Sequence, residues 1–379
     1  MKNPLLSLRL SKSVVGLAEA EAVSRVILQD GYLGMGREVQ HFEAEIAAYL
    51  GVPADAVACV SSGTAGLHLA VEAVTRPGDE VLVQSLTYVA SFQAISAARA
   101  VPVACEVDPA TLTMDLEDAA RRVTEHTRAL MPVHYASNSG DLEAIYRFAE
   151  RFGLRVIEDA AHAFGCTHQG RRIGSFGDVV CFSFDGIKNI TSGEGGAVVT
   201  RDAAVAERIR DARLLGVEHD TTQRYSGGRS WEFDVKHQGY RYHMSNLFAA
   251  IGRVQLNRLE SEFAPARVAL ARRYRQRLQG MAGIRLLDVE LGAVVPHIQP
   301  ILVEHGRRDS VREHLERQGI ATGIHYKPNH LLSLYGGGGV SLPVTESLYE
   351  ALLTLPLHPE LTLADVDRVC EALAAALAV

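Results

Sequence analysis

Short apolar runs alternate with amphipathic segments along the first two hundred residues of the chain. Within residues 39–50, Phe42, Ile46 and Leu50 recur at helical spacing, which predicts a helix that ends at Gly51. Apolar runs without this spacing predict buried strands. The predicted helices are 18–30, 39–50, 65–75, 89–98, 116–123 and 141–152, and the predicted strands are 56–60, 81–83, 101–106, 128–133, 154–158, 178–184 and 197–200. This alternation indicates an α/β fold, whose mainly parallel sheet has helices on both faces.

The last third of the chain predicts a smaller α/β unit. Its first helix begins at Ser245 and carries an apolar stripe that indicates packing against a core. Further predicted elements are a helix over 264–280, a strand over 293–303, a helix over 309–318, a strand over 321–324 and a helix from a capping box at Thr362 to about residue 377. We expect a large domain over residues 1–245, then a linking helix and a small C-terminal domain over 246–379, on which the N-terminal helix could also pack.

Composition and charge exclude several classes of protein. The 379 residues are 47% apolar and 22% charged, as in a soluble protein with a large core. A net charge of −7 without a long basic run argues against a nucleic-acid partner, and no apolar stretch reaches a membrane-spanning length. The N-terminus lacks the apolar core of a signal peptide, and the five cysteines have no metal-ligand spacing. We expect a cytoplasmic protein that binds neither a metal nor a membrane.

A single lysine, Lys188, stands in a glycine-containing loop between the predicted strands 178–184 and 197–200. Lysine is rarely buried without a partner. In a dry pocket the pKa of its amine falls, and the uncharged amine is a nucleophile. From this segment alone, a lysine in a solvent-exposed turn is an equally good interpretation.

Polar residues follow four of the predicted strands. Residues 61–64 read Ser-Ser-Gly-Thr and join a strand to a helix N-terminus, where free N–H groups can bind an anion, although an ordinary helix cap has the same sequence. His134, Asp159 and Lys188 each follow another strand. Because ligands bind at the carboxyl ends of parallel strands, we expect these four features to share one edge of the sheet.

Asp159 follows a buried strand and precedes two alanines, so its carboxylate needs a cationic partner. The partner could be a structural arginine or the protonated ring nitrogen of a cofactor. A lysine, an anion site and a carboxylate at one sheet edge are what pyridoxal phosphate requires. On this interpretation Lys188 binds the cofactor covalently and Asp159 keeps its pyridine nitrogen protonated. The N-terminus of helix 65–75 would bind the phosphate, and Tyr88 would cover one face of the ring.

Several motifs together resemble one known family. They are Phe42-Glu43 with Tyr49-Leu50-Gly51, Ser61 to Ala70, Pro77 to Val81, Pro132-Val133-His134, Glu158 to His162, Ser183-Phe184 with Lys188, Gly193 to Gly196, His325-Tyr326 and Leu355 to Pro359. With these motifs the chain resembles, nearly end to end, the sugar-nucleotide aminotransferases of the DegT/DnrJ/EryC1/StrS group, which are fold type I pyridoxal-phosphate enzymes. The resemblance implies a homodimer with shared active sites.

The resemblance also implies a role for each matching residue. Lys188 would form the internal aldimine and move the proton between substrate and cofactor carbons, and Asp159 would pair with the pyridine nitrogen. His162 stands near the ring hydroxyl, where many members have glutamine. The implied catalytic residues are Lys188, Asp159 and His162; the implied cofactor-binding residues are Ser62, Gly63, Thr64, Tyr88, Asp159, His162, Ser183, Lys188 and Arg241; the implied substrate-binding residues are Trp231, His325, Tyr326, Lys327 and His330.

The sequence departs from the family at residues 239–244, which read Gly-Tyr-Arg-Tyr-His-Met where many members have Gly-Tyr-Asn-Tyr-Arg-Met. In the family, the asparagine reaches the cofactor phosphate of the neighbouring subunit. We hypothesise that Arg241 makes this contact through a charge-assisted bond. Alternatively, Arg241 turns toward a substrate diphosphate or a surface acid. The polar segment 219–237, with Arg229 and Trp231, is either a surface loop or a contribution of the partner subunit to a nucleotide-diphosphate site.

We therefore expect a pyridoxal-phosphate-dependent aminotransferase that moves an amino group from L-glutamate to C3 or C4 of a nucleotide-linked keto-deoxysugar in amino-sugar biosynthesis. A keto-cyclitol is the alternative acceptor. A sugar dehydratase is disfavoured because Lys188 is present and the cysteines are not clustered. A non-catalytic regulatory protein is disfavoured because Lys188 and Asp159 are both intact.

Overall fold

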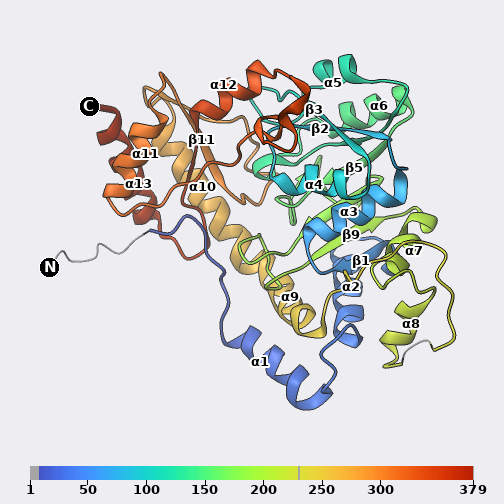
Figure 1. Cartoon of the computed structure of the whole chain (residues 1–379). Coiled ribbons are helices and arrows are strands. Elements are labelled where there is room, and N and C mark those ends of the chain that lie inside the picture. The colour runs from blue at the N-terminus through green and yellow to red at the C-terminus, as the bar shows by residue number, and fades with distance from the viewer. Residues whose placement is uncertain (1–7, 229–230, 379) are drawn as a thin grey trace.

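The larger of two main sheets organises the first two thirds of the chain. The computed structural model describes residues 8–228 and 231–378 (Figure 1). The seven strands, in their order across this sheet, are β1 (Val57–Val60), β9 (Gly196–Thr200), β8 (Val179–Ser183), β5 (Arg155–Asp159), β4 (Thr127–Met131), β2 (Glu80–Gln84) and β3 (Val101–Cys105). β9 is antiparallel to both neighbours, and the other pairs are parallel. The mainly parallel sheet and the α/β fold predicted from the sequence are confirmed.

Helices cover both faces of this sheet. They are α2 (Arg37–Leu50), α3 (Gly63–Val74), α4 (Val89–Ala97), α5 (Leu116–Arg122), α6 (Leu142–Phe152) and α7 (Ala203–Ala212). One apolar cluster joins α2, α5 and α6 to one face, and a second joins α3, α4 and α7 to the other. Successive residues of β8 alternate between the clusters, with Phe182 in the first and Cys181 in the second, as the two-residue period of a strand requires. The core therefore has a three-layer arrangement.

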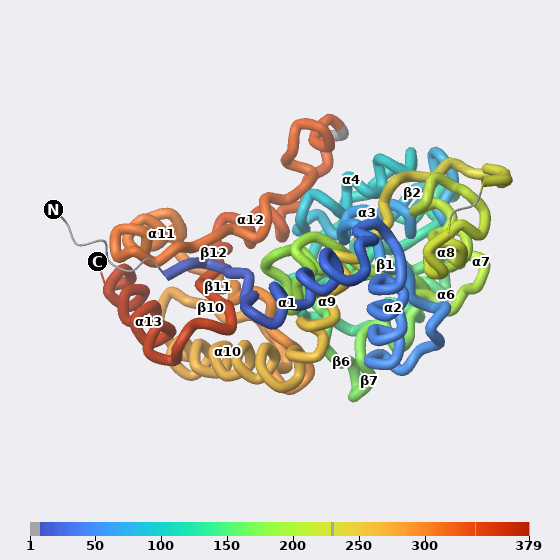
Figure 2. The backbone as a smooth tube through the Cα atoms, turned by 90° about the horizontal axis from the view of Figure 1, so that it is seen from below, coloured from blue at the N-terminus to red at the C-terminus, as the bar shows by residue number. Residues whose placement is uncertain are grey.

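A smaller antiparallel sheet organises the rest of the chain. α9 (Asn246–Arg258) and α10 (Ala264–Leu278) run from the larger sheet to the smaller one (Figure 1). The small sheet contains β10 (Ile284–Arg285), β11 (Gln299–Val303) and β12 (Leu352–Leu355), and its helices are α10, α11 (Arg308–Arg317) and α13 (Leu363–Ala378). Figure 2 shows α10, α11 and α13 at one end of the molecule and α2, α6 and α7 at the other. The boundary predicted after residue 245 falls at the N-cap of α9; the division into two domains stays a prediction.

The N-terminal segment contacts both parts of the molecule. Leu8 exchanges backbone hydrogen bonds with Gly319 and Ala321, beside the small sheet, at 2.9 and 3.0 Å. α1 (Leu17–Arg25) and the π-turn after it (Val26–Asp30) then pack on α9. No helix among the described residues is long and apolar enough to span a bilayer.

The predicted strand over residues 293–303 is wrong for its first half, because β11 begins only at Gln299. Instead of joining a ladder, the Val295 N–H donates to Cys166 Sγ at 3.3 Å and the His297 N–H donates to Ser137 Oγ at 3.0 Å. Residues 321–324 do not form a strand either: Gly323 alone bridges to Thr354.

Several elements were missed by the sequence analysis. They are the hairpin β6 (Thr167–His168) and β7 (Arg171–Arg172), α7, α8 (Asp220–Tyr225), α12 (Pro343–Ala351), β10 and β12, a π-turn (Leu259–Phe263) and the 3-10 turns Ala54–Ala56, Tyr135–Ser137, Asn329–Leu331 and Gly336–Gly338. α8 lies inside the segment 219–237, which is therefore not wholly a loop. The predicted helix 18–30 is α-helical only to Arg25 and continues as the π-turn Val26–Asp30. The other predicted helices and strands are present with boundaries shifted by at most two residues.

A buried ion pair holds α2 against the end of β1. The Arg213 guanidinium is fully buried and donates to Glu43 Oε1 and to the Cys59 carbonyl, both at 2.6 Å. Glu43 also accepts the Cys59 N–H at 2.8 Å and the Tyr225 hydroxyl. The Arg213 carbonyl accepts the Tyr242 N–H at 3.0 Å. This pair therefore positions the segment that carries Arg241.

Replacement of Glu43 should strongly destabilise the protein. Glu43→Ala leaves the Arg213 charge buried without its counterion, so we expect the free energy of unfolding to fall by about 3–5 kcal/mol. Chemical denaturation measures this loss. Asp367→Ala, which breaks the half-buried surface pair with Arg273, is the control and should have a smaller effect. Equal effects of the two variants would contradict a structural role for the buried pair.

Candidate active site

A cavity of about 410 Å³ opens at the carboxyl ends of β1, β4, β5 and β8. The predicted site residues that line it are Ser62, Gly63, Thr64, Tyr88, Asp159, His162, Ser183, Lys188, His325 and Tyr326. Parallel strands direct their carboxyl ends to one edge of a sheet, which explains why Ser62, Asp159 and Lys188 meet here. His325 and Tyr326 reach the same cavity from the segment between α11 and β12.

Lys188 lies in the loop between β8 and β9, part-buried in the cavity wall. Desolvation of its amine lowers the pKa from 10.5 to about 8, although the Asp159 and Asp185 carboxylates act in the opposite direction. Uncharged amine is therefore present near neutral pH, and it is a nucleophile toward carbonyl groups. The solvent-exposed turn, which was the alternative interpretation of this segment, is wrong.

Asp159 at the end of β5 is buried and held from two sides. Its Oδ2 accepts the Ser91 hydroxyl of α4 at 2.7 Å, and its Oδ1 accepts the Ala161 N–H at 3.2 Å. The Thr87 hydroxyl lies 3.0 Å from Ser91 Oγ and continues this network. No arginine pairs with Asp159 among the described residues, so a structural arginine is not its partner. The carboxylate can instead hold a proton on a basic ring nitrogen in the cavity.

The first turn of α3 is suited to a phosphate. Ser62 is the N-cap, and its hydroxyl accepts the Ala65 N–H at 3.1 Å. The first N–H groups of the helix have no partner within the helix and face the cavity edge. A Cβ atom on Gly63 would lie 2.8 Å from the Ser183 Cβ, so glycine is required for this close approach. The backbone of α3 and the Ser183 hydroxyl thus form one small anion cradle.

Buried histidines cover another wall. The His162 ring lies 4.4 Å from the His297 ring, and its Nε2 is 3.2 Å from the Tyr326 hydroxyl. Burial and the nearby Lys188 charge lower the pKa of His162 well below its usual 6.5, so the ring is neutral at neutral pH. Burial also lowers the pKa of His325 to about 4. Tyr88, 57% exposed, lies at the mouth of the cavity, 5.5 Å from the Tyr326 ring.

Four other predicted site residues do not line this cavity: Trp231, Arg241, Lys327 and His330. Lys327 is exposed, and Trp231 is 84% exposed. His330 is buried beside Ser85 and Glu346, which contact its two ring nitrogens at 2.7 and 3.1 Å. The substrate-binding role predicted for His330 has no support in this placement, and the role of Lys327 stays a prediction. Arg229 lies outside the described residues.

Arg241 lies beside the cradle without entering it. The carbonyl of the next residue, Tyr242, accepts the Ser61 N–H at 2.6 Å, which places the segment 240–244 along the end of β1. The Arg241 side chain itself is exposed. His134, also expected at the shared edge, places its Nε2 3.0 Å from Glu158 Oε2 and does not line the cavity.

Sequence reasoning missed several residues of the site. Ser91 and Thr87 have no signal beyond their place at the start of a helix, and His297 stood in a segment predicted as an ordinary strand. Asp185 and Glu194 line the cavity on either side of Lys188. Their positions within a few residues of the lysine, in the same loop, could have identified them.

The residues present fit pyridoxal phosphate. The anion cradle fits a phosphate, Asp159 fits a protonated pyridine nitrogen, and the Lys188 amine fits an aldehyde. A protein with this arrangement can activate an amine or a carbonyl compound through such a cofactor.

Comparison with known proteins agrees with this assignment. Residues 16–374 match the model of the DegT/DnrJ/EryC1/StrS aminotransferase family. The chain is similar to the aminotransferase TlmJ from Streptoalloteichus hindustanus, with 36% identity, 98% and 99% of the two chains covered and a TM-score of 0.90. It is also similar to the sugar aminotransferase CalS13 from Micromonospora echinospora, with 30% identity, coverage of 97% and 99% and a TM-score of 0.88. A third similar structure is Spr1654 from Streptococcus pneumoniae in its PMP form, with 27% identity, coverage of 98% and 97% and a TM-score of 0.89.

The pKa of Lys188 can be tested in cofactor-free protein. The uncharged fraction of the amine should rise with a midpoint near pH 8, so its acylation rate should follow that curve. In Asp159→Asn the midpoint should move lower still, because the carboxylate that favours the charged amine is gone. Mass spectrometry of the Lys188 peptide measures the rate, and Asp30→Asn on the remote π-turn is the control. A wild-type midpoint near 10.5 would contradict a desolvated lysine.

Proposed function

Because this chain belongs to the DegT/DnrJ/EryC1/StrS aminotransferase family, we propose that it transfers an amino group from L-glutamate to C3 or C4 of a nucleotide-linked keto-deoxysugar. Membership makes the protein a pyridoxal-phosphate-dependent sugar aminotransferase. The observation that carries the proposal is the desolvated Lys188 amine in one cavity with Asp159 and the N-terminus of α3. Amino-sugar biosynthesis is the process in which such a reaction takes part.

The residues of the cavity have separate tasks in this proposal. Bound pyridoxal phosphate supplies an electron sink that lets a C–H bond beside nitrogen ionise. Lys188 Nζ, uncharged in part near neutral pH, accepts the proton from one carbon and delivers it to the other. Asp159, fixed by Ser91 and the Ala161 N–H, holds a proton on the ring nitrogen. Neutral His162 donates or accepts a hydrogen bond at the ring hydroxyl without adding charge.

The charge of the cavity supports a homodimer with shared active sites. Among the described residues that line the cavity, Lys188 is the one cationic side chain, beside the carboxylates of Asp159, Asp185 and Glu194. A cofactor phosphate and a substrate diphosphate both need additional positive charge. Arg241 is exposed next to the cradle of its own chain but does not enter it. We therefore place Arg241 at the cofactor phosphate of a second copy.

Three large apolar side chains are strongly exposed and available to a second copy. Leu17 and Leu28 on the N-terminal helices are 75% and 82% exposed, and Trp231 is 84% exposed. Side chains of this size seldom stay in water when a complementary surface exists. Trp231 and Arg241 are both exposed, so both are available to a partner.

A panel of acceptors tests the proposed reaction. With L-glutamate as donor, we expect a nucleotide-linked keto-deoxysugar to gain the mass of an amino group in place of the keto oxygen, and Lys188→Ala to abolish turnover. Mass spectrometry of the products measures this. Tyr335→Phe, which changes a hydroxyl outside the cavity, is the control and should stay active. Turnover of a keto-cyclitol but of no nucleotide sugar would establish the alternative acceptor.

Subunit complementation tests the shared site. Lys188→Ala and Arg241→Ala should each be impaired alone. If Arg241 acts across the interface, a mixture of the two refolded together should regain about a quarter of wild-type activity, because half of randomly formed dimers are hybrids with one intact site. Activity of the mixed and separate variants measures this. No recovery in the hybrids would show that Lys188 and Arg241 act within the same chain. Full activity of Arg241→Ala by itself would show that Arg241 contributes nothing to the site.

A further inference from the structure

The turn that follows β4 has an unfavourable backbone. Ala136 and Ser137 have φ angles of 50° and 74°, although neither is glycine. A Cβ atom disfavours this left-handed region, and two such residues in succession are rare. Backbone strain of this kind persists only where the surroundings fix it, and it is concentrated at functional sites. The contacts of the Ala136 and Ser137 side chains give the reason that this backbone is maintained.

The Ser137 hydroxyl lies at the meeting point of three segments. It is fully buried, 2.6 Å from the His162 carbonyl and 2.8 Å from the Val295 carbonyl. It also accepts the His297 N–H at 3.0 Å. The hydroxyl has a single proton, so it can donate to only one of the two carbonyls at a time. With the His297 N–H, these carbonyls surround the Ser137 oxygen on three sides. The left-handed backbone is what aims the hydroxyl at this point.

These contacts converge on the cofactor side of the cavity. The His297 ring, fixed through its backbone N–H, packs on the His162 ring at 4.4 Å. The Val295 carbonyl also accepts the side-chain amide of Asn189, which follows Lys188, at 2.9 Å. The Ser137 hydroxyl thus joins the His162 loop, the lysine loop and the segment that enters β11.

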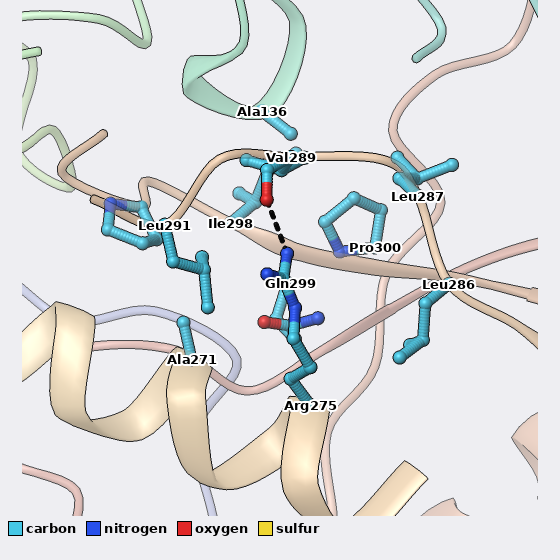
Figure 3. A pocket seen from close by; sticks show the side chains of 11 residues that line it. Ala136, Ala271, Arg275, Leu286, Leu287, Val289, Leu291, Ile298, Gln299 and Pro300 are labelled. Atoms are coloured by element: carbon cyan, nitrogen blue, oxygen red, sulfur yellow. Dashed lines mark hydrogen bonds between the residues drawn. The ribbon is translucent and has the colours of Figure 1, made fainter. Parts of the chain in front are cut away.

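The other side of the turn packs in an apolar cluster in which Tyr135 and Ala136 meet Leu287 and Ile298. Ala136 borders a small cavity of about 40 Å³ between the turn, α10 and the start of β11 (Figure 3). Figure 3 shows Ala136 on one side of this cavity, with Leu287, Ile298 and Pro300 around it. The neighbouring Tyr135 is also fully buried. Packing therefore holds the turn from behind while the hydroxyl of Ser137 faces the polar contacts.

We propose that Ser137 is a positioning residue, whose hydroxyl fixes the His162 main chain and the His297 ring so that the His162 side chain stands at a set place beside the cofactor. This inference rests on the proposed placement of His162 at the ring hydroxyl. The titratable groups that face His162 are Lys188, His134, His297, His325 and the Tyr326 hydroxyl. A displaced His162 ring would change the hydrogen bond to Tyr326 and the surroundings of the bound cofactor together.

Ser137→Ala in the loaded enzyme tests the proposal. The variant leaves the His297 N–H and two carbonyls without their shared partner and keeps the Cβ atom. We expect the pH midpoint of the bound cofactor's absorbance to shift, kcat to fall about tenfold as expected for a misplaced group, and the KM for the amino donor to stay near the wild-type value. Ser137→Gly removes the same hydroxyl and also relieves the strained φ, so it should fold at least as well and show the same spectral shift.

Ser139→Ala is the matched control, because the Ser139 hydroxyl contacts, within the described part of the chain, only the Gly140 carbonyl and His168 on β6, away from His162 and His297. It should leave the titration and kcat unchanged. If both Ser137 variants titrate and turn over like the wild type, the positioning role is wrong while the proposed reaction stands. If His162→Ala binds pyridoxal phosphate and its cofactor absorbance titrates with the same midpoint as the wild type, His162 does not stand beside the cofactor. The inference about Ser137 is then wrong as well.

Discussion

The state of the Lys188 amine depends on two opposing electrostatic effects, and the remainder of the site is arranged around their balance. Burial removes water from the amine and favours its uncharged form, whereas Asp159 and Asp185 favour the ammonium. The resulting pKa of about 8 leaves both forms accessible near neutral pH. Such an amine can attack a carbonyl group and can also deliver a proton. Hydrogen bonds from the Ser91 hydroxyl and the Ala161 N–H hold the Asp159 carboxylate in place at the end of β5.

The topology of the sheet largely determines where Lys188, Asp159 and the first turn of α3 lie relative to one another. β1, β8, β5 and β4 are parallel in direction, and their carboxyl ends meet at one edge. β9 is antiparallel to β8, so the chain must turn back at that same edge, and Lys188 lies in the turn. The close contact of Gly63 with Ser183 then brings the first turn of α3 against the end of β8. A phosphate bound there lies on the same side of the sheet as the lysine and the aspartate.

The sequence was sufficient for the parts of the site that depend on strand order. Asp159, Lys188 and residues 62–64 each follow a strand, and parallel pairing alone brings them together. It was insufficient where a single side chain decides the outcome. Residues 293–298 look like a strand, yet Cys166 and Ser137 bind their amides, and those two residues lie more than a hundred positions away. His330 follows a site motif, yet Ser85 and Glu346 occupy its ring nitrogens. A local sequence pattern cannot predict contacts between residues that are so far apart in the chain.

The charge of the cavity bears on the proposed homodimer. Three carboxylates and one lysine, as the described lining has them, give a surface that repels a cofactor phosphate and a substrate diphosphate. The helix N-terminus offsets part of this repulsion, but its effective charge is only about half an elementary charge. On the proposed dimer, further positive charge comes from a second copy. Arg241 stands at the rim with its side chain in solvent, at the end of a backbone segment that the buried Arg213–Glu43 pair holds in place. A buried ion pair costs desolvation energy and is rarely justified by stability alone. In the proposed dimer, the Arg213–Glu43 pair would fix the backbone that carries Arg241, so that Arg241 can reach the cofactor phosphate of a second copy.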